Sequence, residues 1–211
     1  LGTHLIKRLE QEGQNIKALS RTPQEEAHFV VGDVVEDDIS PLMNGCDVLI
    51  HAAGLVSHKM EDADLLWKIH VEGTQRTFAA AEKAGITRVI YLSTSGTIAV
   101  SKSPKEISED HGAPFHLIKE WPYYRSKLFA EQLAMKQHTF DVICLNPSLL
   151  LGPGDRPEGE STRSIRLFLD DQMPMAPSGG MAYVDVRDVV EGTIAALTKG
   201  RSGERYLLNG C

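Results

Sequence analysis

The stretch Arg88-Val89-Ile90-Tyr91-Leu92-Ser93 decides the fold. Its apolar residues follow one another without the polar alternation that marks a half-buried strand. Residues 48–50 and 142–145 have the same continuous apolar character. Strands of this kind are buried on both faces, as in a parallel sheet that helices cover on either side. The sequence therefore predicts a parallel sheet at the centre of the molecule.

Helical and strand-like segments alternate on either side of these runs. Expected helices span residues 2–12, about 62–84, about 121–137 and 186–198, and expected outer strands span 15–20, 28–31 and 205–208. The alternation predicts an α/β fold with a doubly wound parallel sheet, which is Rossmann-like. The stretch 152–163 is rich in Gly, Pro and charge, so we expect a loop there.

Composition and charge exclude several classes of protein. The 211 residues are 42% hydrophobic and 24% charged, which is typical of a globular protein rather than a disordered one. The formal net charge is −7 and no basic cluster is present, so we expect no nucleic-acid partner. No apolar run approaches the ~18 residues of a membrane span, and we expect no membrane association. Eight histidines lack paired ligand spacing, so no metal site is expected.

The cysteines and the ends of the chain give two weaker expectations. Cys46, Cys144 and Cys211 are widely spaced, and we expect them to be reduced thiols. No secretory signal is visible, so we expect a cytoplasmic protein. The chain begins at Leu1 directly in a helical pattern and stops just after a strand-like segment. We expect a fragment with sequence missing at both ends.

Small and polar residues follow the expected strands, where ligands of a doubly wound sheet bind. Gly2 opens the first helix, whose free N–H groups and positive dipole end suit a phosphate, but it is only one of the three glycines of a dinucleotide fingerprint. Ser20 and Arg21 end the second strand, and no Asp or Glu occupies 18–23. Arginine there suits a 2′-phosphate, which favours NADP(H) over NAD(H), although an exposed turn arginine fits as well.

Two further strand ends complete the expected cofactor edge. Asp33 and Val34 follow the third strand, and Asp33 can accept a hydrogen bond from the adenine amino group, although a turn aspartate explains it almost equally well. Ala52, Ala53 and Gly54 follow the fourth strand, where small residues allow a close approach of the cofactor.

Tyr123 and Lys127 are four residues apart on an expected helix and therefore share a face. A tyrosine hydroxyl, with a reference pKa near ~10, is a poor base at neutral pH. A nearby ammonium favours the phenolate, so we expect Lys127 to lower the pKa of Tyr123 and allow proton transfer to or from a substrate hydroxyl. Taken alone, such a pair is common by chance, and two unrelated surface residues explain it better.

The context of this pair resembles the extended short-chain dehydrogenase/reductase family. The resemblance covers nearly the whole chain, in family order, and it is nearest the dihydroflavonol-reductase-like and 3β-hydroxysteroid-dehydrogenase-like branch. It is carried by Pro122-Tyr123-Tyr124-Arg125-Ser126-Lys127-Leu128-Phe129-Ala130-Glu131, Ser93-Thr94-Ser95, Val71-Glu72-Gly73-Thr74, Asn146-Pro147-Ser148 through Gly152-Pro153-Gly154, and Tyr183-Val184-Asp185-Val186-Arg187-Asp188-Val189.

The resemblance implies roles for these residues. Tyr123 is the expected acid/base, Lys127 holds the ribose and tunes Tyr123, and Ser95 polarises the substrate carbonyl. The expected cofactor contacts further include Ser93, Thr94, Asn146, Pro147 and Ser148. His70 departs from the family, which has asparagine there.

The resemblance also implies an organisation of the chain and an assembly. Residues 1–150 form an NAD(P)-binding domain that lacks its first strand and first glycines. Residues 151–211 form a partial substrate-binding region, interleaved with returning elements of the Rossmann-like fold. We further expect a homodimer through the helices near 62–84 and 121–137.

Three functions stay open at this point. Family dehydratases carry an acidic pair after the catalytic hydroxyl residue, whereas Ser95 is followed by Gly96-Thr97, and the Tyr-Gly of epimerases is replaced by Ile98-Ala99-Val100. The sequence favours a reductase or dehydrogenase of a small-molecule carbonyl or alcohol substrate. The alternatives are a nucleotide-sugar epimerase and a dinucleotide-binding regulator without turnover.

Overall fold

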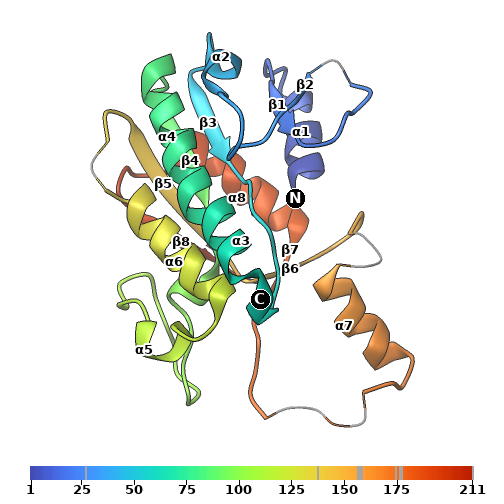
Figure 1. The fold of residues 1–211 in the computed structure, drawn as a ribbon. Helices are drawn as coiled ribbons and strands as arrows, with labels where there is room; N and C mark the ends of the chain where they lie inside the picture. Colours follow the sequence, from blue (N-terminus) through green and yellow to red (C-terminus); the bar gives the residue numbers. More distant parts are fainter. Residues whose placement is uncertain (27, 137, 156–158, 174, 176–177, 211) are drawn as a thin grey trace.

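The computed structural model describes residues 1–26, 28–136, 138–155, 159–173, 175 and 178–210. Its centre is a four-stranded parallel sheet in the order β3-β4-β5-β8 (Figure 1). These strands are β3 (Val48–His51), β4 (Arg88–Leu92), β5 (Asp141–Pro147) and β8 (Arg205–Leu208). Two parallel pairs lie outside it: β1 (Ala18–Ser20) with β2 (Phe29–Val31), and β6 (Leu149–Leu151) with β7 (Tyr183–Asp185). The predicted α/β parallel-sheet fold is confirmed.

Helices cover the sheet on both faces, as the continuous apolar strands predict. One face packs on α4 (Gly73–Ala84) and α6 (Pro122–Ala134), and the opposite face packs on α8 (Val186–Lys199), beside which α1 (Gly2–Gln11) lies (Figure 1). Val89 and Tyr91 of β4 belong to the first core, whereas Ile90 and Leu92 belong to the second. Successive side chains of a strand point to opposite faces, so two buried faces require an unbroken apolar run.

The register of the sheet places the carboxyl ends of β3 and β4 side by side, whereas β5 runs past them and pairs with β8. His51 pairs with Tyr91, which pairs with Cys144, which in turn pairs with Arg205. The segments that follow β3 and β4 therefore emerge at the same edge, next to the end of β5. This is the edge at which parallel α/β sheets bind ligands.

The helix expected at about 62–84 is not continuous. It comprises the 3₁₀ turn η1 (Met60–Asp62), α3 (Ala63–Trp67), the five-residue π-helical segment η2 (Lys68–Glu72) and α4. A π-helical turn inserts an extra residue into an α-helix and is frequent at functional sites. Here the insertion directs His70 into the interior, where its side chain is only 1% exposed.

Other elements also differ from the sequence prediction at their ends. The strand expected over 15–20 begins only at Ala18, and β5 continues through Asn146 and Pro147, because Pro147 still pairs with Leu208 at the end of the ladder. The loop expected over 152–163 contains the start of α7 (Glu160–Leu169). Two short helices, α2 (Ser40–Met43) and α5 (Phe115–Ile118), were not expected. The domain boundary near residue 150 stays a prediction.

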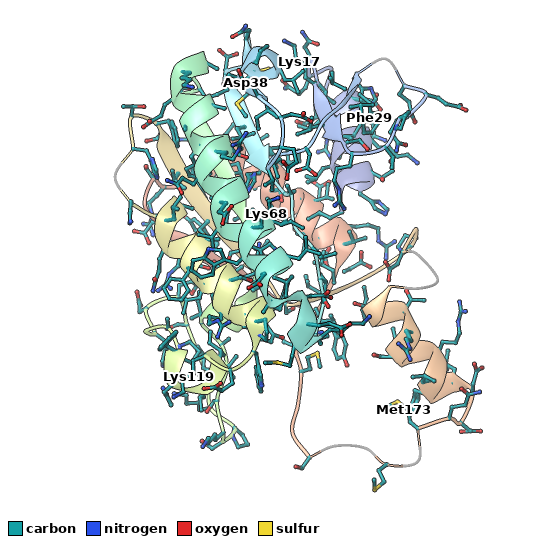
Figure 2. The ribbon with its side chains drawn as sticks, in the orientation of Figure 1. Lys17, Phe29, Asp38, Lys68, Lys119 and Met173 are labelled. Carbon is teal, nitrogen blue, oxygen red and sulfur yellow. The ribbon has the colours of Figure 1, made fainter. Side chains whose placement is uncertain are left out.

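Helix α7 lies apart from the sheet and carries an exposed apolar surface. Phe168 and Leu169 are 68% and 71% exposed. Figure 2 shows Met173 beyond the outer end of this helix, also away from the sheet. The described part of the core thus lies around the sheet and not around α7.

Candidate active site

Lys127 lies beneath the carboxyl end of β4. Helix α6 begins at Pro122, which suits the first helical position because proline lacks the N–H that would otherwise stay unbonded there. One turn further, Lys127 is buried, and its Nζ donates a hydrogen bond to Leu92 O at 2.8 Å and lies 5.3 Å from the centre of the Tyr91 ring. Burial lowers the pKa of Lys127 to about 8. The group therefore keeps most of its charge at neutral pH.

Tyr123, one turn before Lys127, has a pKa that differs from the expectation. Burial, followed by the neighbouring Tyr124, raises the pKa of Tyr123 to about 12, although a hydrogen bond with Thr94 acts in the opposite direction. The expected lowering by Lys127 is wrong for the chain by itself. Its ammonium is bonded to the Leu92 carbonyl, and the loss of hydration around the phenol outweighs the other influences.

The hydroxyl-bearing turn after β4 provides the partner of Tyr123. Ser95 starts the 3₁₀ turn η3 (Ser95–Thr97), and its backbone oxygen accepts from the N–H groups of Ile98 and Ala99. The hydroxyl bonded to the Tyr123 phenol belongs to Thr94 and not to Ser95. Ser95 is half-buried, and its role as the group that polarises a carbonyl stays a prediction.

The residues expected on the nicotinamide side have prominent structural roles. Asn146 is fully buried and donates to Thr94 O at 3.1 Å, so it joins the end of β5 to the turn after β4. Pro147 and Ser148 are also buried, and Ser148 Oγ donates to Leu208 O at 3.3 Å. Their assignment to the cofactor stays a prediction.

The residues expected at the adenosine side lie at the carboxyl ends of β1 and β2 or just after them. Asp33 Oδ1 accepts a hydrogen bond from Val35 N at 2.7 Å and so closes a turn. Its contact with the adenine stays a prediction. Ser20 Oγ accepts from Thr22 N at 3.3 Å, and Arg21 is exposed. Val34 packs against Gly73, where a Cβ would lie 3.1 Å from the valine side chain.

Small residues lie at the start of α1 and after β3. A Cβ built on Gly2, at the start of α1, would meet no atom within 4 Å, and the described chain supplies no side-chain cap to this helix end. Ala52 and Gly54 are exposed and Ala53 is half-buried after β3. A helix N-terminus and small residues at such an edge are features that dinucleotide-binding sites use.

His70 links the loop after β3 to helix α6. Its Nε2 accepts from Leu55 N at 3.1 Å, so Nδ1 carries the proton and donates to Ser126 Oγ at 2.8 Å. The Ser126 hydroxyl then donates to Tyr123 O at 2.9 Å. The sequence showed only that His70 departs from the family pattern, because its two contacts come from segments distant along the chain.

The arrangement agrees with the comparison with known protein families. Residues 1–208 match the model of the NAD dependent epimerase/dehydratase family. This chain belongs to that family. The predicted resemblance is thereby confirmed at the level of the family.

Curated relatives in this family include reductases and sterol-modifying proteins. The chain is 32% identical over 221 residues to a provisionally named dihydroflavonol 4-reductase of Synechocystis sp., covering 99% of this chain and 64% of the relative. It is 28% identical over 220 residues to sterol demethylase protein B of Methylococcus capsulatus, covering 100% of this chain and 66% of the relative. The chain thus spans about two thirds of the length of these relatives.

Solved structures of the family have the same fold. The crystal structure of gox2253 matches with a TM-score of 0.89 and 27% identity over 100% of this chain and 67% of that one. The structure of MoeE5 in complex with UDP-glucuronic acid and NAD matches with a TM-score of 0.79 and 25% identity, over 98% of this chain and 71% of that one.

Two other kinds of site are absent from the described residues. None of the helices there combines the length and the apolar character that a bilayer crossing needs. No group of three or more potential metal ligands gathers in that part of the chain.

Proposed function

We propose that this chain forms the cofactor-binding part of an NAD(P)-dependent oxidoreductase that interconverts a small-molecule carbonyl and its alcohol. The observation that carries the proposal is the placement of Tyr123 and Lys127 on successive turns of α6, beside the end of β4, with Thr94 bonded to the phenol. Reductases among the relatives support this reaction class.

Each residue contributes a separate step. A bound nicotinamide cofactor supplies or accepts the hydride. Tyr123 is protonated at neutral pH, because burial raises its pKa, and it donates this proton to the substrate oxygen during reduction. Lys127 has one N–H bonded to Leu92 O and no further hydrogen bond among the described residues, so its other N–H groups are available to the ribose. Ser95 donates to the same substrate oxygen.

NADP(H) is the cofactor that we propose. Exposed Arg21 follows β1 and no acidic residue lies over 18–23, so a 2′-phosphate would meet a guanidinium and no carboxylate from this segment. Titration of the full-length protein with NADPH and NADH, followed by cofactor fluorescence, tests the preference. Equal or tighter binding of NADH would refute it.

A nucleotide-sugar epimerase is the second candidate, because a UDP-glucose 4-epimerase of Mycolicibacterium smegmatis is 26% identical over 98% of this chain. The residue that follows Ser95 argues against a dehydratase. A Cβ on Gly96 would lie 2.0 Å from the Tyr124 ring, so this turn has no room for the acidic side chain of dehydratases.

We further propose that the active form is a cytoplasmic homodimer. Trp67 on α3, Phe115 on α5 and Phe129 on α6 are all more than a third exposed, and Phe129 contacts both of the other rings. An apolar face on these helices suits a second copy of this chain. Free thiols at Cys46 and Cys144 agree with a reducing compartment. Sedimentation of wild type and Phe129→Glu tests the assembly, and a wild-type monomer would refute it.

Turnover assays separate the candidate functions. A reductase consumes NADPH with some member of a panel of aldehydes and ketones, and Tyr123→Phe lowers kcat roughly 10²- to 10⁴-fold. Tyr124→Phe is the matched control, because it removes a neighbouring hydroxyl but keeps the ring against Gly96. Conversion of UDP-glucose without net NADPH consumption supports the epimerase. Cofactor binding without turnover in any variant supports a regulator and refutes both enzymes.

A further inference from the structure

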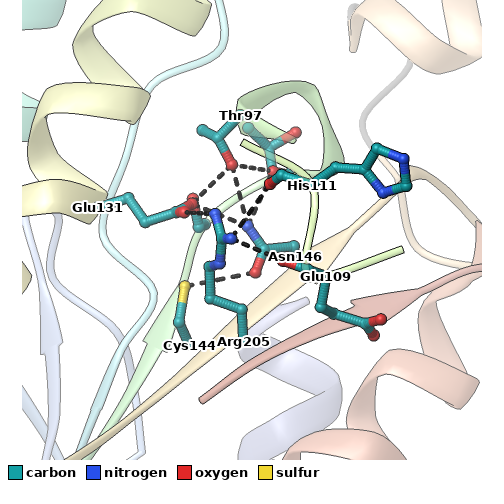
Figure 3. Close-up of polar contacts among 9 residues, drawn as sticks. Thr97, Glu109, His111, Glu131, Cys144, Asn146 and Arg205 are labelled. Carbon is teal, nitrogen blue, oxygen red and sulfur yellow. Dashed lines mark hydrogen bonds and ion pairs between the residues drawn. The ribbon is translucent and has the colours of Figure 1, made fainter. Parts of the chain in front are cut away.

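A buried carboxylate lies beneath the hydroxyl-bearing turn. Glu131 is one turn beyond Lys127 on α6 and is 3% exposed. Its Oε2 accepts three hydrogen bonds (Figure 3). The donors are Ser93 Oγ, Thr97 Oγ1 at 2.6 Å and Asn146 Nδ2 at 2.8 Å. Ser93 and Thr97 lie on either side of Ser95 in the sequence. A single carboxylate oxygen of α6 therefore anchors the turn both before and after Ser95.

The charge of Glu131 is balanced by an arginine of strand β8. Arg205 on β8 places Nη1 3.5 Å from Glu131 Oε1, the oxygen that the three donors leave open. A buried carboxylate is unfavourable unless it is paired and hydrogen-bonded. Because all these partners are present, the network should hold its side chains rigidly in a single arrangement.

The same arginine reaches a loop outside the core. Arg205 Nη2 donates to Glu109 O at 2.6 Å and to His111 O at 3.3 Å, and the Glu109 carboxylate accepts from Leu207 N at 2.8 Å. Figure 3 shows Arg205 between these backbone groups and Glu131. His111 lines a cavity of about 360 Å³ formed within residues 98–117. A loop beside this cavity is thus tied to the carboxylate that holds the turn.

We propose that Glu131 is a positioning residue, which fixes the turn Ser93–Thr97 relative to Tyr123, and that Arg205 couples this turn to the loop 105–112. The proposal rests on the oxidoreductase function proposed above. Glu131 and Tyr123 belong to one helix, so a fixed distance along α6 sets where the hydroxyls lie relative to the phenol. Displacement of such groups by about 1 Å can lower a rate by roughly 100-fold.

The test compares Glu131→Gln with Asp141→Asn in the full-length protein. The first change keeps shape and an acceptor oxygen but leaves Arg205 without its charge partner. The control removes the acidic partner of Arg88, a pair at the other end of β4 and β5. We expect Glu131→Gln to lower kcat about 10- to 100-fold while the NADPH dissociation constant changes less than about twofold, and the control to leave both unchanged. A kcat equal to that of the control would overturn the proposal.

Variants of Arg205 test the coupling. Arg205→Met leaves the Glu131 carboxylate unpaired, whereas Arg205→Lys keeps a cation near it but lacks the planar fork. We expect kcat to fall in the methionine variant and to recover in part in the lysine variant. If Glu131→Gln does not fold, Thr97→Val removes one donor without touching the ion pair and is expected to lower kcat about tenfold.

Hydrogen exchange provides a readout that does not need turnover. In this turn, Thr97 N donates a backbone hydrogen bond to Thr94 O, and Ile98 N donates one to Ser95 O. We expect faster exchange over 93–98 in Glu131→Gln, and over both 93–98 and 105–112 in Arg205→Met. Unchanged exchange over 93–98 would overturn the positioning role. If wild type shows no turnover, the proposed function fails, and the exchange result still decides this inference.

Discussion

Acid should destabilise this protein through two buried histidines. His51 and His70 are 4% and 1% exposed, and burial, followed by the nearby Lys127 charge, lowers the pKa of each to about 3. His51 Nε2 is bonded to Thr74 Oγ1 at 3.1 Å. His70 Nε2 accepts from Leu55 N, so it cannot take a proton without losing that bond. Both rings therefore stay neutral in the folded protein.

The sign and size follow from proton linkage. An unfolded histidine takes up a proton below its ordinary pKa of 6.5, whereas these two folded rings do so only near 3. Between these values the unfolded chain binds more protons, so the free energy of unfolding falls as pH falls. Each pH unit corresponds to about 1.36 kcal/mol per group. Acidification from pH 6.5 to about 5 therefore costs roughly 2 kcal/mol per histidine, against a typical total of ~5–15 kcal/mol.

Urea unfolding at about pH 7.5 and about pH 5 measures this dependence. We expect His51→Gln and His70→Asn each to remove about half of the loss that wild type shows on acidification, whatever their effect on stability at neutral pH. His116→Gln is the control, because this histidine is exposed on α5. An acid-induced loss that is as large in both buried variants as in wild type would refute the reasoning.

Three further outcomes are expected. The pKa of Lys127 is about 8 in the folded protein but ~10.4 in the unfolded chain. Between these values the unfolded chain binds one more proton, so Lys127 makes the free energy of unfolding rise with pH. Urea unfolding of Lys127→Met should lack that rise. Gly96→Ala places a Cβ 2.0 Å from the Tyr124 ring and should cost about 1–3 kcal/mol and lower kcat, whereas a variant as stable and active as wild type would contradict this packing. Arg21→Glu should weaken NADPH binding more than NADH binding in fluorescence titrations, and an equal effect on both would exclude contact with the 2′-phosphate.

Much of the fold follows from local patterns in the sequence. The run 88–93 predicted a strand buried on both faces, and β4 indeed contributes Val89 and Ile90 to opposite cores. Asp185 before an apolar helical pattern is a typical cap, and its side chain accepts from Arg187 N at the start of α8. These features depend on neighbours within a few residues, which the sequence displays directly.

The sequence by itself determined the parallel sheet and the shared face of Tyr123 and Lys127, because strand and helix periodicity are local properties. Only the tertiary structure decided that the pKa of Tyr123 rises, that Thr94 contacts its hydroxyl and that Glu131 lies under the turn. Hydration and hydrogen-bond partners depend on which distant segments cover a side chain. Asn146 and Arg205 reach Glu131 on α6 from two different strands, and no spacing along the chain indicates that these three residues meet.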